Sequence, residues 1–257
     1  WTRRGGYPVL SVHHTNKGTQ VSQSRFLSSS ISRKLMKDKT LWQVPVVWKK
    51  EGEKKEQNTI IGKRTVFFTG LKPGSKLNSR ESGLYRVDYP REYLEALKPM
   101  IANKTLAAVD RLGIVRDVFA LAESGQTPTT LALSILNAYK DEDEYIVWRE
   151  IVTGLGRLSS VLYGTSAYPL LNKFKLSLYS PVAKRLGWLP EDGEPHTAPM
   201  LRDMMIYQSG VSGDEEITKE AVRLFEEWRG GGEAPEKDIR SAVYSLVSRV
   251  GDEKRFE

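Results

Sequence analysis

The spacing of apolar residues changes near residue 85, from short alternating runs to a helical period. In the first part, apolar and polar side chains alternate in runs that end at turn residues, as in an antiparallel β-sandwich. The predicted strands cover residues 7–14, 20–27, 42–49, 60–61 and 66–68. Trp42 and Trp48 fall on one face of the third run together with two valines, so we expect that face in the core. Pro45 cannot donate to a neighbouring strand, which predicts a sheet edge or a bulge there.

After Tyr89 and Pro90 the apolar residues recur with a period of about 3.6, which is typical of amphipathic helices. Eight helices are predicted, over residues 90–102, 104–124, 128–140, 143–163, 167–187, 197–209, 214–228 and 235–249. Gly113 is a weak point within the second helix, because glycine has a low helix propensity. In the last helix a single apolar stripe is formed by Ile239, Val243, Leu246, Val247 and Val250.

These patterns predict an α+β, multidomain protein. An antiparallel β-sandwich is expected over residues 1–88, and an all-α superhelix over residues 89–257. Short amphipathic helices with brief connections favour HEAT- or armadillo-like antiparallel pairs that stack as a solenoid. No capping partner follows the last helix, so we expect the superhelix to be truncated at its C-terminal end.

Several helix starts carry capping signals. Thr127 precedes Pro128 as a cap precedes a first-turn proline, and residues 212–215 have the spacing of a capping box that starts at Ser212. The acidic run from Asp141 to Glu144 precedes a helix, where negative charge is favourable near the positive end of the helix dipole. We interpret this run as capping and not as a catalytic pair of acids.

The net charge of +7 is unevenly distributed. Residues 1–85 hold 17 Lys and Arg against 5 Asp and Glu, whereas residues 86–257 hold 22 against 27. Basic residues on strand edges and loops discourage edge pairing, and this explanation is preferred. A nucleic-acid interface on the basic half is the alternative, and it would require binding that weakens steeply with salt.

The residues of catalytic and metal sites are sparse. The chain has no cysteine, and its three histidines do not form a ligand pair, since His13 and His14 are neighbours on a predicted strand and His196 lies beside a proline. Phosphate-binding and nucleophile-elbow motifs are absent, and Gly230 to Gly232 is interpreted as a connection between helices. The tryptophans are expected mainly in the core. We therefore predict no catalytic, cofactor-binding or metal residues here, and no membrane partner, since no apolar run is long enough to span.

Short motifs along nearly the whole chain occur in an order that identifies a family. They are Trp1-Thr2 with Gly6-Tyr7-Pro8-Val9, Gln23-Ser24-Arg25-Phe26-Leu27, Trp42-Gln43-Val44-Pro45-Val46, Gly83-Leu84-Tyr85-Arg86-Val87-Asp88-Tyr89, Asp110-Arg111 with Asp117-Val118-Phe119-Ala120-Leu121 and Gly125, Tyr145-Ile146-Val147-Trp148, and Pro181-Val182-Ala183-Lys184-Arg185-Leu186-Gly187-Trp188. In order and content they resemble the C-terminal region of gluzincin zinc aminopeptidases of the puromycin-sensitive and endoplasmic reticulum type. Arg4 and Leu84 depart from the family pattern at positions that are not catalytic.

The resemblance implies a segment without an active site. In that family the zinc ligands and catalytic residues precede the residue that matches Trp1, and further helices follow the last one here. The implied role is a sandwich spacer and a helical bowl that closes over the catalytic domain, so that peptide substrates are enclosed and selected. The implied partners are the catalytic domain of the same polypeptide and peptides, with zinc only in the parent protein and a cytoplasmic location.

The substrate-binding residues stay unassigned. Some relatives hold the C-terminal end of a peptide with a tyrosine-lysine pair, but the matching positions here are Leu158 and Ser159, so that subsite is not transferred. A protein-interaction scaffold from a catalytically inactive relative is the alternative function, because the same fold can carry different functions.

Overall fold

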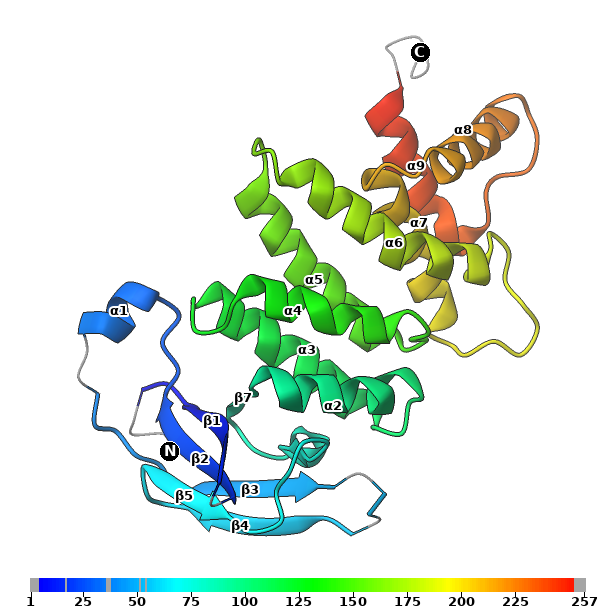
Figure 1. Ribbon diagram of the computed structural model, residues 1–257. Helices are drawn as coiled ribbons and strands as arrows, with labels where there is room; N and C mark the ends of the chain where they lie inside the picture. The colour runs from blue at the N-terminus through cyan, green and yellow to red at the C-terminus, as the bar shows by residue number, and fades with distance from the viewer. Residues whose placement is uncertain (1–4, 17, 36–37, 51, 54, 252–257) are drawn as a thin grey trace. The chain divides into compact units, whose positions relative to one another are not determined.

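The structure is a computed structural model that describes residues 5–16, 18–35, 38–50, 52–53 and 55–251 (Figure 1). The residues Trp1 and Thr2 of the first motif, and Arg4, lie outside the described residues. The chain forms two compact units, unit 1 over residues 1–142 and unit 2 over residues 143–257. The predicted domain boundary between residues 88 and 89 coincides with the change from strand to helix but lies inside unit 1, and it stays a prediction.

Unit 1 contains two small sheets, with strand orders β5-β2-β1-β7 and β4-β3-β6. The strands are β1 (Pro8–Thr15), β2 (Gly18–Arg25), β3 (Val44–Lys49), β4 (Gln57–Ile61), β5 (Thr65–Phe68), β6 (Lys76–Leu77) and β7 (Arg86–Asp88). All pairs are antiparallel except β1 with β7. A parallel pair needs a long connection, and the strands between β1 and β7 in the sequence supply it. The predicted sandwich followed by helices is confirmed, with this one parallel pair added.

The predicted face of β3 is confirmed as core. Trp42 and Trp48 are 3% and 6% exposed, and Trp48 makes an edge-to-face contact with Phe68. An edge position is wrong for β3 as a whole, which lies between β4 and β6, but it describes the strand correctly at Pro45. Pro45 is accommodated since β6 pairs only with residues 48 and 49, which leaves β3 with β4 as its partner where the proline lies.

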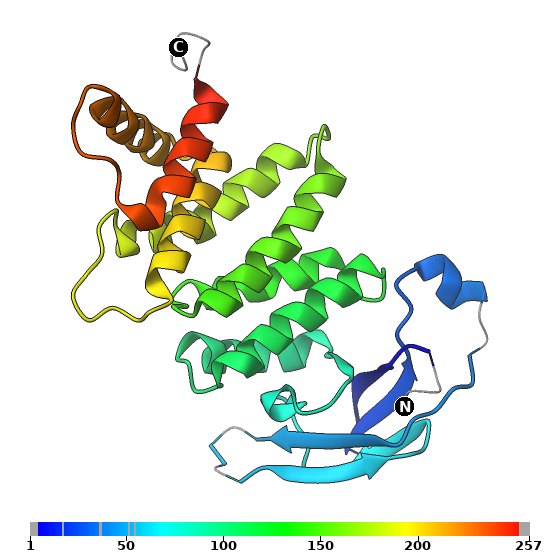
Figure 2. The same ribbon diagram turned by 180° about the vertical axis from the view of Figure 1, so that it is seen from behind.

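All eight predicted helices are present (Figures 1 and 2). They are α2 (Arg91–Ala102), α3 (Ala108–Glu123), α4 (Thr129–Ile135), α5 (Tyr145–Leu162), α6 (Tyr168–Leu186), α7 (Ala198–Val211), α8 (Glu215–Arg229) and α9 (Arg240–Val250), with short 3-10 turns at Ser79–Glu81, Leu136–Tyr139 and Lys237–Ile239. A short helix, α1 (Ser30–Leu35), was not predicted. The second predicted helix, α3, begins later than predicted because Lys104 has a φ of 56°, which cannot continue a helix.

Within unit 2, consecutive helices pack as pairs. α6 lies against α7, α8 lies against α9, and α7 contacts both α5 and α9. The apolar stripe predicted for the last helix is confirmed for four members, since Ile239, Val243, Leu246 and Val247 are at most 2% exposed. Val250 is 52% exposed and does not belong to the core.

Two of the predicted helix caps are wrong. The hydroxyl of Thr127 donates to Asp88 at 3.2 Å, and the N-cap position of α4 is Pro128 without a side-chain cap. At α8 the cap is Asp214, whose Oδ1 accepts from the backbone N of Ile217 at 3.2 Å. Ser212 ends α7 instead. A sequence offers several polar residues near each helix start, and the local backbone conformation decides which of them reaches the free amides.

One residue of the acidic run before α5, Glu142, forms a buried ion pair with Arg111. Glu142 accepts from Nε and Nη2 of Arg111 at 2.6 and 2.7 Å, and the two side chains are 1% and 5% exposed. The N-cap residue of α5, Glu144, makes no side-chain cap hydrogen bond. The capping interpretation is therefore wrong for Glu142, whereas Glu144 does occupy the N-cap position of α5.

The turn after β6 packs against α3 through a buried polar cluster. Lys76 lies 3.1 Å from Glu81 and 3.6 Å from Asp110, and Glu81 also pairs with Arg116. About two turns beyond Asp110 on α3, Asp117 accepts from the backbone N of Val87 at 2.9 Å. Burial, with the charge of Glu81, raises the pKa of Asp117 to about 6. These contacts join the strands of unit 1 to its helices.

The Glu81 carboxylate of this cluster contacts α3 at Gly113, where only a residue without a side chain leaves room for it. A Cβ at position 113 would overlap the carboxylate of Glu81, which its two cationic partners hold in place. At Gly156, on α5, an added Cβ would have no neighbouring atom within 4 Å.

Gly113→Ala is expected to lower the free energy of unfolding by about 1–3 kcal/mol, because the added methyl group overpacks a buried site. Gly156→Ala is the matched control and should raise it by about 0.5–1 kcal/mol, since alanine restricts the unfolded chain more than glycine. Urea unfolding of the 257-residue chain, followed by circular dichroism, measures both. A stabilised Gly113→Ala variant would show that Glu81 can move aside.

Candidate functional site

The three histidines do not form a metal site. His13 and His14 are exposed at the end of β1, and His196 is exposed in the loop before α7. Among the residues that the structure describes, no group of three or more His, Cys, Asp or Glu could hold a metal ion. In the same residues, no helix combines the length and the apolar character that crossing a membrane requires.

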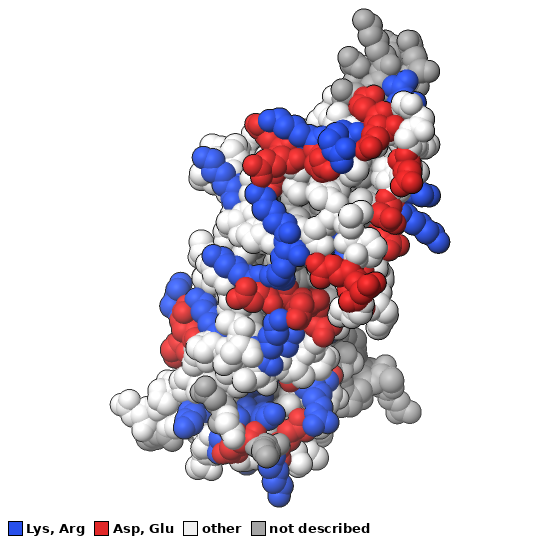
Figure 3. Space-filling model, turned by 90° about the vertical axis from the view of Figure 1, so that its right-hand side faces the viewer, with Lys and Arg blue, Asp and Glu red and all other residues white. Residues whose placement is uncertain are grey.

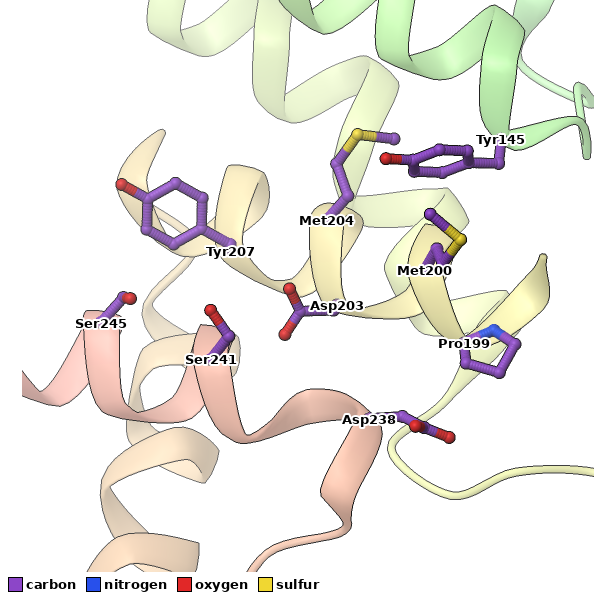
Figure 4. Close-up of a pocket in the computed structure, with 9 residues that line it drawn as sticks. All are labelled: Tyr145, Pro199, Met200, Asp203, Met204, Tyr207, Asp238, Ser241 and Ser245. Atoms are coloured by element: carbon purple, nitrogen blue, oxygen red, sulfur yellow. The ribbon is translucent and has the colours of Figure 1, made fainter.

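A pocket of about 470 Å³ lies in unit 2, formed by α7, α9, the turn before α9 and the start of α5 (Figure 4). It is lined by Tyr145, Pro199, Met200, Asp203, Met204, Tyr207, Asp238, Ser241 and Ser245. Sequence reasoning assigned none of these residues to a site. The lining combines two tyrosines and two methionines with two carboxylates, and it includes no lysine, arginine or histidine.

The wall supplied by α7 follows from helical spacing. Met200, Asp203, Met204 and Tyr207 are separated by three or four residues, so they share one face of the helix. The opposite face is core, with Leu201, Met205 and Ile206 at most 1% exposed. Because α7 carries apolar residues on both faces, its periodicity alone does not distinguish the pocket from the core. The one feature of the sequence that could have indicated the pocket is the carboxylate of Asp203, which shares a helix face with Met200 and Met204.

Asp203 connects the two main helices of the pocket. Its Oδ1 accepts from the backbone N of Ala242 at 2.9 Å, in the first turn of α9. This bond satisfies an amide that has no partner within its own helix and places a negative charge near the positive end of the helix dipole. Burial raises the pKa of Asp203 above its ordinary value, and the hydrogen bond from Ala242 offsets only part of this rise.

The pocket carries negative charge without a compensating cation. Neither Asp203 nor Asp238 has a salt-bridge partner among the residues that the structure describes. Ser241 and Ser245 lie one turn apart on α9, and no histidine lines the pocket to activate either hydroxyl. The arrangement is suited to a partly apolar ligand with a positive group.

Leu158 and Ser159, the positions compared with a peptide-binding pair, lie near the C-terminal end of α5 and outside this pocket. The hydroxyl of Ser159 accepts from Nζ of Lys175 on α6 at 3.4 Å. Lys175 is 6% exposed, and burial lowers its pKa.

The basic excess of the first half is partly used in ion pairs. Arg25 pairs with Asp38, Arg80 with Glu56 and Lys76 with Glu81. On the face that Figure 3 presents, Lys and Arg lie among Asp and Glu. Of the six tryptophans, Trp42, Trp48 and Trp148 are buried, whereas Trp228 is 41% exposed and Trp188 is intermediate. This distribution is that of core residues and not of a continuous base-stacking surface.

Comparison with known proteins gives a consistent picture. Residues 75–257 match the family described as "ERAP1-like C-terminal domain". The chain is 32% identical over 263 residues to the alanine/arginine aminopeptidase of Saccharomyces cerevisiae, with 100% of the chain and 30% of the yeast protein covered. It is 28% identical to the puromycin-sensitive aminopeptidase of Caenorhabditis elegans over 100% of the chain and 28% of that protein. For aminopeptidase M1-A of Oryza sativa subsp. japonica the identity is 30%, over 99% of the chain and 30% of the protein. The chain thus spans about 30% of the length of these relatives, and the resemblance based on the motifs is confirmed.

Proposed function

Because the chain belongs to the ERAP1-like C-terminal domain family, we propose that it is the non-catalytic C-terminal segment of a zinc-dependent aminopeptidase. In this proposal the segment closes over the catalytic domain of the same polypeptide and helps to enclose and select peptide substrates. Zinc belongs to the catalytic domain of the parent protein, and the segment itself needs no cofactor. The β-sandwich of residues 1–88 is the spacer, residues 89–257 are the closing superhelix, and the location is cytoplasmic.

The pocket on α7 and α9 is the observation that supports a role in peptide contact. It has the volume of a small-ligand site, and its polar groups are carboxylates and hydroxyls between methionine and tyrosine side chains. Methionine side chains adapt their shape and are common on surfaces that accept several ligands. Such a lining suits segments of different peptides better than it suits one rigid ligand.

When the segment closes over the catalytic domain, this pocket can affect the rate of catalysis although it contains no catalytic residue. A domain that closes over an active site excludes water and commits the substrate before the chemical step. Contacts made with a peptide far from the scissile bond contribute to the rate when they are strengthened in the closed form. A long peptide therefore gains from the segment, whereas a small aminoacyl reporter reaches only the catalytic domain.

The test compares these two substrates in the full-length parent protein. Ser241→Trp fills the pocket, and it should lower the ratio of activity on a nonapeptide to activity on an aminoacyl reporter by about tenfold, the effect of losing about 1.4 kcal/mol of binding. Ser177→Trp is the matched control, because Ser177 is an exposed serine on α6 outside this pocket. A chelator should abolish both activities, and the 257-residue chain alone should release no amino acid.

An equal loss on both substrates would contradict the selecting role. Turnover by the isolated chain that a chelator abolishes would contradict its non-catalytic character. A full-length parent without any peptidase activity would favour the interaction scaffold from a catalytically inactive relative.

A further inference from the structure

We propose that the pocket on α7 and α9 binds the side chain of a lysine or arginine in the peptide, through the carboxylates of Asp203 and Asp238. This inference rests on the proposed function, because it names the class of peptide that the same pocket selects. The preference concerns a residue downstream of the one that is released.

The two carboxylates come from different walls of the pocket. Asp203 projects from the middle of α7, and Asp238 lies in the turn before α9 (Figure 4). Both line the same hollow of about 470 Å³. No lysine, arginine or histidine lines it with them, so the hollow has an uncompensated negative charge. A cationic group from outside the chain would provide the missing partner.

The remaining lining matches the rest of a basic side chain. Figure 4 shows Tyr145, Met200 and Met204 close to one another beside Asp203. The methylene groups of lysine and arginine bury well against apolar side chains while the charged end stays at a polar site. Tyrosine rings also attract cations over their faces. The pocket therefore offers apolar contact along the stem and negative charge for the head group.

Asp203 is prepositioned for this role. The bond from the backbone N of Ala242 to Oδ1 fixes the carboxylate between α7 and α9. Among the described residues, no side chain donates to its other oxygen, Oδ2, which is the atom available to a ligand. Since both helices are rigid elements, a peptide cation would meet a carboxylate that needs little reordering.

The experiment measures kcat/KM of the full-length parent on alanine-based nonapeptides. One downstream position at a time carries lysine, arginine, norleucine or glutamate, and norleucine has the length of lysine without its charge. At one position we expect lysine and arginine to be preferred over norleucine by about tenfold, which corresponds to about 1.4 kcal/mol. Glutamate should be disfavoured there.

Asp203→Asn removes the charge but keeps an oxygen that can accept from Ala242. It should reduce the lysine-to-norleucine ratio at that position about threefold or more, and Asp203→Asn with Asp238→Asn should bring the ratio to about one. Asp214→Asn is the matched control, because Asp214 also accepts from a helix amide, the N of Ile217, outside this pocket. It should leave the ratio unchanged, and thermal unfolding by circular dichroism verifies that each variant is folded.

The outcomes separate this inference from the proposed function. If the parent cleaves peptides but prefers lysine at no downstream position, or if Asp203→Asn leaves the preference intact, the inference is wrong and the proposed function stands. If the parent cleaves no peptide, fluorescence anisotropy of labelled lysine and norleucine nonapeptides decides the inference by itself. Equal affinity for the two probes would overturn it, and tighter binding of the lysine probe that Asp203→Asn removes would support it.

Discussion

Replacing Arg111 by methionine is expected to lower the free energy of unfolding by about 3–5 kcal/mol, the range found when one partner of a buried ion pair is removed. The guanidinium makes two parallel hydrogen bonds to Glu142, of 2.6 and 2.7 Å, and its Nη1 donates to the carbonyl of Leu106 at 2.6 Å. With the Glu142 side chain only 1% exposed, removal of Arg111 leaves a carboxylate that water cannot reach.

The cost comes mainly from the charge that is left behind. Methionine fills much of the volume of arginine, so the packing loss is small in comparison. Arg111→Met combined with Glu142→Leu should therefore destabilise the chain less than Arg111→Met alone, because the double variant removes both charges of the pair. A simple count of lost hydrogen bonds would not predict that the double variant is more stable than Arg111→Met.

Urea unfolding of Arg111→Met, Glu142→Leu and the double variant measures the effect, and hydrogen exchange of peptides from α3 assigns it to unit 1. Exchange is needed because a chain with two compact units need not unfold in one two-state transition, and urea unfolding alone does not say which unit is affected. A double variant whose loss of stability equals the sum of the losses of the two single variants would contradict the explanation, since additive losses mean that Arg111 and Glu142 do not interact energetically.

Trp148→Ala is expected to destabilise unit 2 by about 3–5 kcal/mol, the usual range for a large aromatic residue removed from a core. Trp148 is 0% exposed on α5, and its ring meets Tyr179 of α6 edge to face at 6.1 Å. Alanine leaves a cavity between the two helices that neighbouring side chains fill only in part.

Trp228→Ala is the matched control. Trp228 is 41% exposed at the end of α8, where it stacks on Tyr244 at 5.6 Å, and its loss should cost about 1 kcal/mol. Urea unfolding together with hydrogen exchange of α5 and α6 peptides measures both substitutions. Equal effects at the two positions would mean that the exposed aromatic contacts of α8 and α9 contribute as much as the core.

Much of the fold could be predicted because it depends on local periodicity. The switch from a period of two to a period of about 3.6 located five of the seven described strands and all eight predicted helices, and the alternation from Trp42 to Trp48 identified a buried face. Boundaries were less certain. At α8, Ser212 and Asp214 are both suitable caps, and only the backbone path brings Asp214 to the amide of Ile217.

The candidate site could not be predicted, because its residues resemble core residues in the sequence. Met200, Met204 and Tyr207 have the helical spacing of a buried stripe, and only the packing of α7 between α5 and α9 leaves them around a hollow. Asp203 lies 39 positions before the amide that it accepts from, a distance at which sequence spacing has no predictive value.

By itself, the sequence determined the types of element, the order of strands before helices, and, through its ordered motifs, the family. These properties follow from neighbouring residues, whose faces are set by the geometry of a strand or a helix. The tertiary structure decided which polar residues meet. It paired Arg111 with Glu142, placed Glu81 against Gly113, and set Asp203 opposite α9. Burial makes an unpaired charge costly, so these long-range contacts are selected by the packing of whole elements and not by any local pattern.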